Sequence, residues 1–167
     1  MDFFVCKHLA KSFNSHVIFS NISLSFPSKG LISLVGPSGC GKSTLINCLL
    51  GIEKCEGEIF FQENKITDFD KFRNKFATII FQNFNLFEFL SVEENITFFA
   101  KSKDFNKIVK LLKLEDKLDQ EVRYLSGGEK QRVALARSLM KDPLIIFCDE
   151  VTGSLDLENE IIIMNFL

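Results

Sequence analysis

The segment Gly36-Pro-Ser-Gly-Cys-Gly-Lys-Ser-Thr44 has the spacing G-x-x-x-x-G-K-[ST] of a phosphate-binding P-loop. Glycines let the backbone turn so that successive N–H groups face one anion. The Lys42 ammonium can reach the outer phosphates of a nucleotide, and the Ser43 hydroxyl can hold Mg²⁺. The residues predicted to bind the nucleotide here are Gly36, Pro37, Ser38, Gly39, Cys40, Gly41, Lys42, Ser43 and Thr44.

Two carboxylates, Asp149 and Glu150, follow the apolar run 144–148, which has the pattern of a buried parallel strand. A buried strand has little reason to end in paired acids unless a cation or a proton transfer requires them. Beside a P-loop, Asp149 is predicted to hold Mg²⁺ opposite Ser43. Glu150 is predicted to orient or deprotonate the attacking water. The alternative is a solvated strand end without chemistry.

A second anion-receptive helix start is predicted at Leu125-Ser-Gly-Gly-Glu129. Ser126 can cap the helix, and Gly127 and Gly128 leave backbone N–H groups open to an anion. Ser-Gly-Gly alone is commonly just a loop. The Gln131-Arg132 pair and the alanine-rich helix that follows favour the functional interpretation.

These residues need strands and helices to hold them in place. We expect strands at 2–9, 16–26, 31–35, 57–62, 76–81 and 144–148, and helices at 44–50, 92–102, 104–114, 127–140 and 158–167. Ser91 and Glu94 have the spacing of a capping box, and Gly51 is expected to end the helix after the P-loop. The lysines within 103–117 are interpreted as a solvated helix face, with a partner-binding patch as the alternative.

Composition limits the class of protein. The chain has 167 residues, of which 46% are apolar, so it is long and apolar enough for one domain with a sizeable core. The net charge of −2 gives no electrostatic argument for nucleic acid as a partner. Five cysteines without a C-x-x-C pair, and two histidines, argue against a disulfide framework or a zinc site. No signal peptide or 18-residue apolar stretch is recognisable, so we expect a cytoplasmic protein without direct membrane insertion.

Together these motifs resemble the nucleotide-binding subunit of an ABC transporter, from about residue 3 to the C-terminus. The segment 36–44 resembles Walker A, Asp149 and Glu150 resemble the Walker B acids, and 125–129 resembles the signature motif. Segments 152–156 and 83–96 are most similar to the branch serving permeases of the lipoprotein-release and macrolide-export type.

Three further residues take roles from this resemblance. Gln82, after Phe81, resembles the Q-loop glutamine, which contacts Mg²⁺ and links to a helical lobe. Asp156 lies in a D-loop-like Ser-Leu-Asp segment. Phe13 lies where the family places an aromatic ring that stacks on adenine. The alternatives are an ordinary core phenylalanine for Phe13 and a polar strand end for Gln82.

The resemblance implies an α/β fold: a P-loop NTPase core with a parallel sheet, an N-terminal antiparallel β part and an inserted small helical subdomain. The chain is expected to be a single ATP-binding domain, with 1–82 and 126–167 as the core and 83–125 as the helical part. Two such domains, identical or different, would pair head to tail, so that ATP on one P-loop meets Ser126, Gly127 and Gly128 of the other. A transmembrane permease subunit would dock near Gln82 and place the protein at the inner face of the cell membrane.

Two departures from the family pattern stand out. Val151 replaces the proline that usually follows the catalytic glutamate. Both histidines, His8 and His16, precede the P-loop, so neither fits the family's switch histidine, and the sequence is interpreted as a C-terminally truncated domain. The alternatives to a transporter ATPase are therefore a nucleotide-binding fragment with little or no ATPase activity, and a non-transport ABC ATPase acting in translation or DNA repair.

Overall fold

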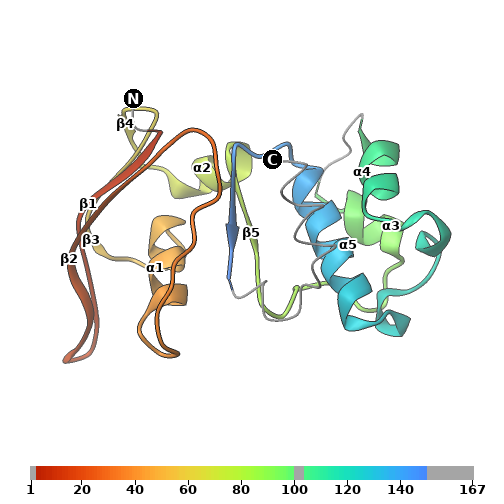
Figure 1. Ribbon diagram of the computed structural model, residues 1–167, viewed down its shortest axis with the longest axis horizontal. Helices are drawn as coiled ribbons and strands as arrows, with labels where there is room; N and C mark the ends of the chain where they lie inside the picture. The colour runs from red at the N-terminus through yellow and green to blue at the C-terminus, as the bar shows by residue number, and fades with distance from the viewer. Residues whose placement is uncertain (1–2, 100–103, 150–167) are drawn as a thin grey trace. The chain divides into compact units, whose positions relative to one another are not determined.

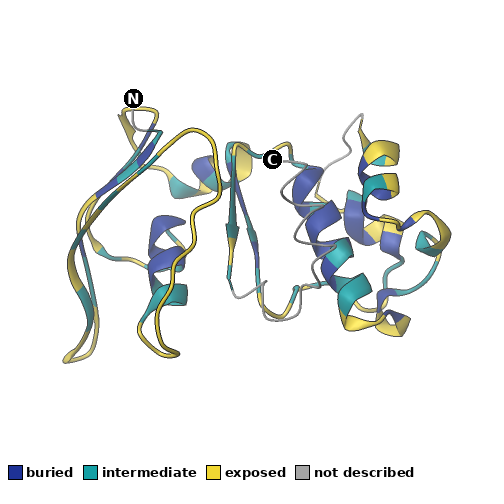
Figure 2. Cartoon of the chain, in the orientation of Figure 1, coloured by how far each residue is buried: buried dark blue, intermediate teal, exposed yellow. Residues whose placement is uncertain are grey.

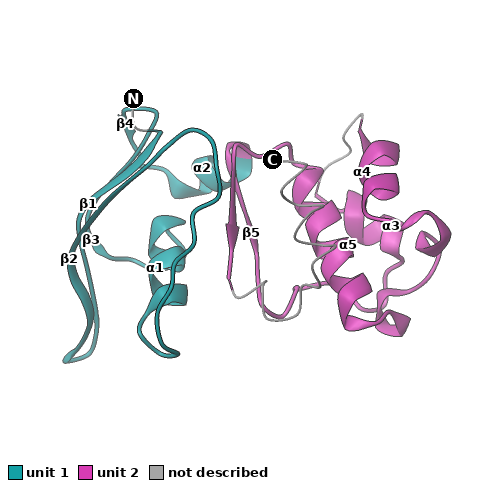
Figure 3. Cartoon of the chain, in the orientation of Figure 1, with its two compact units in different colours: residues 1–74 teal, residues 75–167 magenta. Residues whose placement is uncertain are grey.

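The computed structural model describes residues 3–99 and 104–149, and it divides the chain into two compact units, Met1–Asn74 and Lys75–Leu167 (Figures 1 and 3). The helix expected at 158–167 lies outside the described residues, as do Glu150 and Asp156.

Unit 1 contains a four-stranded antiparallel sheet in the order β2-β1-β3-β4. The strands are β1 (Phe4–Phe13), β2 (His16–Phe26), β3 (Glu56–Phe61) and β4 (Asn64–Lys65). Strand β1 runs four residues beyond its expected end because it forms a hairpin with β2 that closes only at Asn14, whose φ is 53°. Asparagine tolerates this left-handed conformation better than most residues. The N-terminal antiparallel part of the predicted fold is confirmed.

Phenylalanine rings fill much of the apolar side of this sheet. Phe4 of β1 and Phe61 of β3 are buried, and both contact Phe72, with ring centroids 5.9 and 5.4 Å away. Phe72 belongs to α2 (Phe69–Lys75), a helix that we did not expect from the sequence. Its start is capped by Asp68, whose Oδ1 accepts a hydrogen bond from the backbone N of Lys71 at 2.9 Å.

Helix α1 (Lys42–Leu49) follows the P-loop directly, as predicted. It ends at Leu49 with Leu50 as its C-cap, and Gly51 has a φ of 66°, the left-handed conformation that commonly follows a helix. A Cβ at Gly51 would lie 2.2 Å from the ring of Phe69, so no other residue fits this close approach.

The prediction of a strand at 31–35 is wrong. No regular strand is assigned there, and Leu31, Ile32 and Val35 are 63, 47 and 91% exposed. An apolar run indicates that a segment tends to be buried. A strand also needs a neighbouring strand to accept and donate its backbone hydrogen bonds. The paired strands described in unit 1 all belong to the antiparallel sheet, and segment 31–35 pairs with none of them.

Unit 2 holds a parallel pair of strands, β5 (Ala77–Ile80) and β6 (Ile145–Cys148). Their register pairs Ala77 with Ile145 and Ile80 with Cys148. Strand β5 is mostly buried, whereas β6 is half-buried and Cys148 is exposed (Figure 2). The parallel sheet is confirmed, but within the described part of unit 2 the second strand is less buried than its apolar sequence predicts.

The helices of unit 2 are α3 (Val92–Thr97), α4 (Phe105–Leu111) and α5 (Gly127–Leu139). The first two are shorter than expected, and two 3₁₀ turns, η1 (Glu115–Lys117) and η2 (Val122–Tyr124), complete the connection to α5. Ser91 and Glu94 form the predicted capping box of α3. The described residues include no helix that combines the length and the apolar character needed to cross a bilayer.

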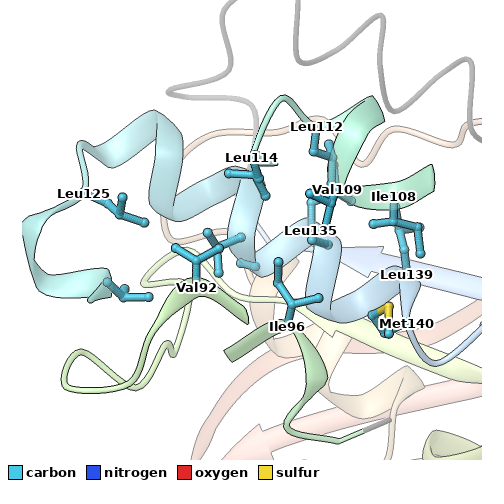
Figure 4. Close-up of a cluster of buried hydrophobic side chains, with 14 of the residues drawn as sticks. Val92, Ile96, Ile108, Val109, Leu112, Leu114, Leu125, Leu135, Leu139 and Met140 are labelled. Atoms are coloured by element: carbon cyan, nitrogen blue, oxygen red, sulfur yellow. The ribbon is translucent and has the colours of Figure 1, made fainter. Parts of the chain in front are cut away.

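One apolar cluster joins these helices (Figure 4). Val92 and Ile96 of α3, Ile108 of α4 and Val133 of α5 are each at most 1% exposed. The cluster includes apolar residues of α5 from Val133 to Leu139. It therefore holds α5 against α3 and α4.

Candidate functional site

Backbone conformation in the P-loop depends on glycine. Gly39 and Gly41 have φ values of 79° and 95°, a region that other residues rarely adopt. A Cβ at Gly41 would lie 2.6 Å from Cγ2 of Ile18 on β2, and one at Gly36 would lie 2.9 Å from Sγ of Cys40. The positive φ at positions 39 and 41, and the close approach of Ile18 at Gly41, favour glycine on this path into α1, and the loop itself is exposed (Figure 2).

Lys42 is the first residue of α1, and its side chain turns back over the loop. Its Nζ donates hydrogen bonds to the carbonyl oxygens of Gly36 and Pro37, at 2.9 Å each, and lies 3.9 Å from Sγ of Cys40. Gly41, the residue before α1, supplies no side-chain cap to the helix. An ammonium group, a glycine backbone and an uncapped helix start therefore meet in one short segment, which fits a phosphate chain.

Phe13 lies at the end of β1, opposite His16 in the hairpin. Its ring is 44% exposed, so it is not an ordinary core phenylalanine. Nζ of Lys11 lies 4.4 Å from the ring centroid, in cation–π contact. Nζ of Lys11 also donates a hydrogen bond to Glu53 Oε2 at 3.0 Å, which helps to hold the ammonium group beside the ring.

Gln82 and Asp149 come to one edge of the parallel pair in unit 2. The backbone N of Asp149 donates to the carbonyl of Ile80 at 3.0 Å, which continues the ladder one residue past β6. Gln82 follows β5 by two residues and is exposed. Since Ser43 belongs to unit 1, its predicted place opposite Asp149 stays a prediction, as do the roles of Glu150 and Asp156.

Ser126 caps α5 as predicted, in a capping box with Glu129. The Ser126 Oγ accepts from the backbone N of Glu129 at 3.3 Å, while the backbone N and the hydroxyl of Ser126 each donate to Glu129 Oε2 at 2.8 Å. These two donors, the backbone N–H first, hold the pKa of Glu129 below its ordinary value, and Lys117 at 3.5 Å from Oε1 adds to this. Among residues 3–99 and 104–149, nothing lies within 4 Å of a Cβ placed at Gly127 or Gly128, so this helix start is open in the described part of the chain.

Two residues that the sequence did not single out hold the segment after Gln82. Arg137 of α5 donates from Nη1 to the carbonyl of Asn85 and from Nη2 to that of Phe84, at 2.8 Å each. Asn95 of α3 is fully buried and bonds to the backbone of Phe87. The sequence signal that could have identified Arg137 and Asn95 is weak: each is a polar residue among the apolar positions of its helix.

The chain matches a family model described as ABC transporter over residues 19–153. Two of its curated relatives are the sulfate/thiosulfate import ATP-binding protein CysA of Vibrio vulnificus and the spermidine/putrescine import ATP-binding protein PotA of Clostridium novyi. They are 34 and 36% identical over 91% of this chain, and the match covers 47 and 46% of the relatives. The chain thus spans about half the length of these relatives. Their names describe import, which gives the expected lipoprotein-release and macrolide-export branch no support.

Solved structures agree with the family match. The dimeric structure of MJ0796, described as a bacterial ABC transporter cassette, has a TM-score of 0.83 and 30% identity and covers 97% of this chain and 80% of that one. The cbiO1 protein of Clostridium perfringens, part of the transporter complex cbiONQ, has a TM-score of 0.84 and 26% identity and covers 99 and 74%. By the family match over residues 19–153 and the shared cassette fold, this chain belongs to the ABC transporter family of ATP-binding cassettes.

Proposed function

We propose that this chain binds ATP at its P-loop and acts as the ATP-binding subunit of an ABC transporter. The observation that carries the proposal is the arrangement of Lys42, whose ammonium lies over a glycine backbone at the start of α1. In that position the cation and the helix N–H groups can share one phosphate chain. The exposed ring of Phe13 is proposed to stack on the adenine.

The metal is proposed to be Mg²⁺, held by Ser43, Gln82 and Asp149. Hydroxyl, amide and carboxylate oxygens are hard ligands, which fit this cation. Bound there, Mg²⁺ would neutralise charge on the outer phosphates. Glu150 is proposed to orient the attacking water or accept its proton, which makes ATP hydrolysis the proposed reaction.

The proposed partners are a second ATP-binding domain and a membrane permease. Ser126, Gly127 and Gly128 would contact the nucleotide held by the second domain, and Asp156 would lie at the same interface. The open helix start at the two glycines supports this, because a Cβ built at either one meets no atom of the described residues within 4 Å. The dimeric state of MJ0796 and the import names of the relatives support pairing and transport. The permease would hold the protein at the cytoplasmic face of the membrane.

Equilibrium dialysis with ATP tests the site. We expect Lys42→Ala to abolish measurable binding, since it removes the main positive charge facing the phosphates. Lys71→Ala, at an exposed lysine of α2 in the same unit, is the matched control and should bind like the unchanged chain. Equal ATP affinity in both variants would reject the P-loop as the binding site.

A further inference from the structure

Arg137 is a half-buried cation that the proposed nucleotide site does not use. It lies on α5, about three helical turns after Ser126. Burial lowers the pKa of its guanidinium. A charged group in such a place needs strong hydrogen bonds to offset its desolvation. Its guanidinium donates two hydrogen bonds to adjacent carbonyls, those of Phe84 and Asn85.

Both of those residues have an unfavourable backbone conformation. Phe84 and Asn85 have φ values of 58° and 47°, and this left-handed conformation costs roughly 1 kcal/mol or more at Phe84 but less at Asn85, because asparagine tolerates it better. The same turn is closed by hydrogen bonds from Phe84 N to Phe81 O at 2.9 Å and from Asn85 N to Asn83 O at 2.6 Å. Gln82 lies inside this turn, so the conformation that Arg137 stabilises is the one that orients Gln82.

The bond pattern also explains why this residue is an arginine. A guanidinium presents two parallel N–H donors with fixed separation, which suits two neighbouring carbonyls, whereas an ammonium is a single flexible point charge. The far end of the segment is held independently by Asn95, which bonds to Phe87 and, from Nδ2, to Leu90 O at 3.3 Å. Loss of the arginine should therefore loosen the turn near Gln82 without releasing the whole segment.

We propose that Arg137 is a positioning residue, which fixes the turn at 81–85 so that Gln82 faces the Mg²⁺ of the bound nucleotide. This inference rests on the proposed function, because it takes Gln82 as a ligand of the metal. It assigns α5 a second role: the helix that begins at the signature-like Ser126 also sets the conformation of the Gln82 turn.

The first test is hydrogen exchange of the purified chain without nucleotide. We expect Arg137→Lys to speed exchange of the amides at 83–85 by roughly tenfold, while those of α3 stay protected. Arg123→Lys is the matched control, since its guanidinium pairs with Glu121 and not with this turn. Unchanged exchange at 83–85 in Arg137→Lys would overturn the proposed clamp.

The second test measures ATP affinity by equilibrium dialysis, with Mg²⁺ and with EDTA. In Arg137→Lys the affinity gained from Mg²⁺ should fall roughly three- to tenfold, while affinity in EDTA should stay within about twofold of the unchanged chain. In a Gln82→Ala background, adding Arg137→Lys should cause no further loss, because both changes remove the same interaction. Additive losses, or an equal loss in EDTA, would overturn the positioning role in favour of a merely structural one. An unchanged chain that binds no ATP under either condition would reject the proposed function itself, and with it the role of Gln82.

Discussion

The carboxamide of Asn95 bonds to the backbone of Phe87 through both of its polar atoms. Oδ1 accepts from Phe87 N and Nδ2 donates to Phe87 O, each at 2.9 Å, and Nδ2 also donates to Ser91 O at 3.0 Å. Asn95 is fully buried, so water cannot replace these bonds. The residue ties α3 to the segment that follows Gln82.

Replacing Asn95 by alanine should therefore destabilise unit 2. The change removes the acceptor of Phe87 N, whereas Phe87 O keeps its bond from Leu90 N at 3.2 Å, so we expect a loss of about 1 to 2 kcal/mol. Urea unfolding can be followed by the fluorescence of Tyr124, because the chain has one tyrosine and no tryptophan. Thr97→Ala, which removes a hydroxyl bond to Glu93 O within the same helix, is the control and should cost below about 0.5 kcal/mol. Equal losses in the two variants would contradict the role of Asn95.

Gly57→Ala should weaken the sheet of unit 1 severely. Gly57 has a φ of 101°, and a Cβ there would lie 2.5 Å from the carbonyl oxygen of Lys7 and 2.7 Å from that of His8. Backbone atoms cannot rotate away, so we expect a loss of about 3 kcal/mol or more, read from thermal unfolding by circular dichroism. Gly30→Ala, with a φ of 119° and open space, should show only the smaller backbone strain. A Gly57 variant no worse than the Gly30 variant would refute the clash.

Gly128→Ala should raise the stability of α5 while it prevents ATP-dependent dimerisation. The position is inside α5, and a Cβ there meets no atom within 4 Å in the part of the chain that the structure describes, so alanine should stabilise the helix by about 0.5 to 1 kcal/mol. If this helix start contacts the nucleotide of a second domain, the added methyl group should block ATP-dependent dimers in size-exclusion chromatography. Lower stability would contradict the first expectation, and undiminished dimers would contradict the second.

The Glu129 carboxylate should make the stability of unit 2 depend on pH. The backbone N–H of Ser126, and then its hydroxyl, lower the pKa of Glu129 in the folded chain. A lowered pKa stabilises the folded state above the unfolded value of about 4.3. This contribution is lost as the pH falls below that value and through the lower folded pKa.

Glu129→Gln should show less of this acid sensitivity. The amide oxygen of glutamine can still accept the bond from Ser126 N, but it carries no charge to titrate. Urea midpoints between pH 7 and pH 3 should therefore differ between the two chains at neutral pH and converge in acid. Parallel pH profiles would show that the Ser126–Glu129 contact contributes nothing that depends on charge.

Sequence rules predicted the features that depend on neighbouring residues. The capping box at Ser91, the helix cap at Ser126 and the helix directly after the P-loop follow from residue types at fixed spacing, and the structure confirms all three. The run 31–35 failed because apolar residues predict a need for burial but do not supply a pairing partner. The bond from Arg137 to Asn85 joins residues 52 positions apart, and local patterns carry no information about it.

The register of β5 and β6 restricts how this region can change during evolution. Side chains alternate between the two faces of a strand, so losing or gaining one residue would reverse every following side chain. It would also displace Gln82 or Asp149 from the sheet edge, since each follows its strand by only one or two residues. Natural variants should therefore exchange one apolar residue for another within these two four-residue strands while conserving their length, and insertions should accumulate elsewhere.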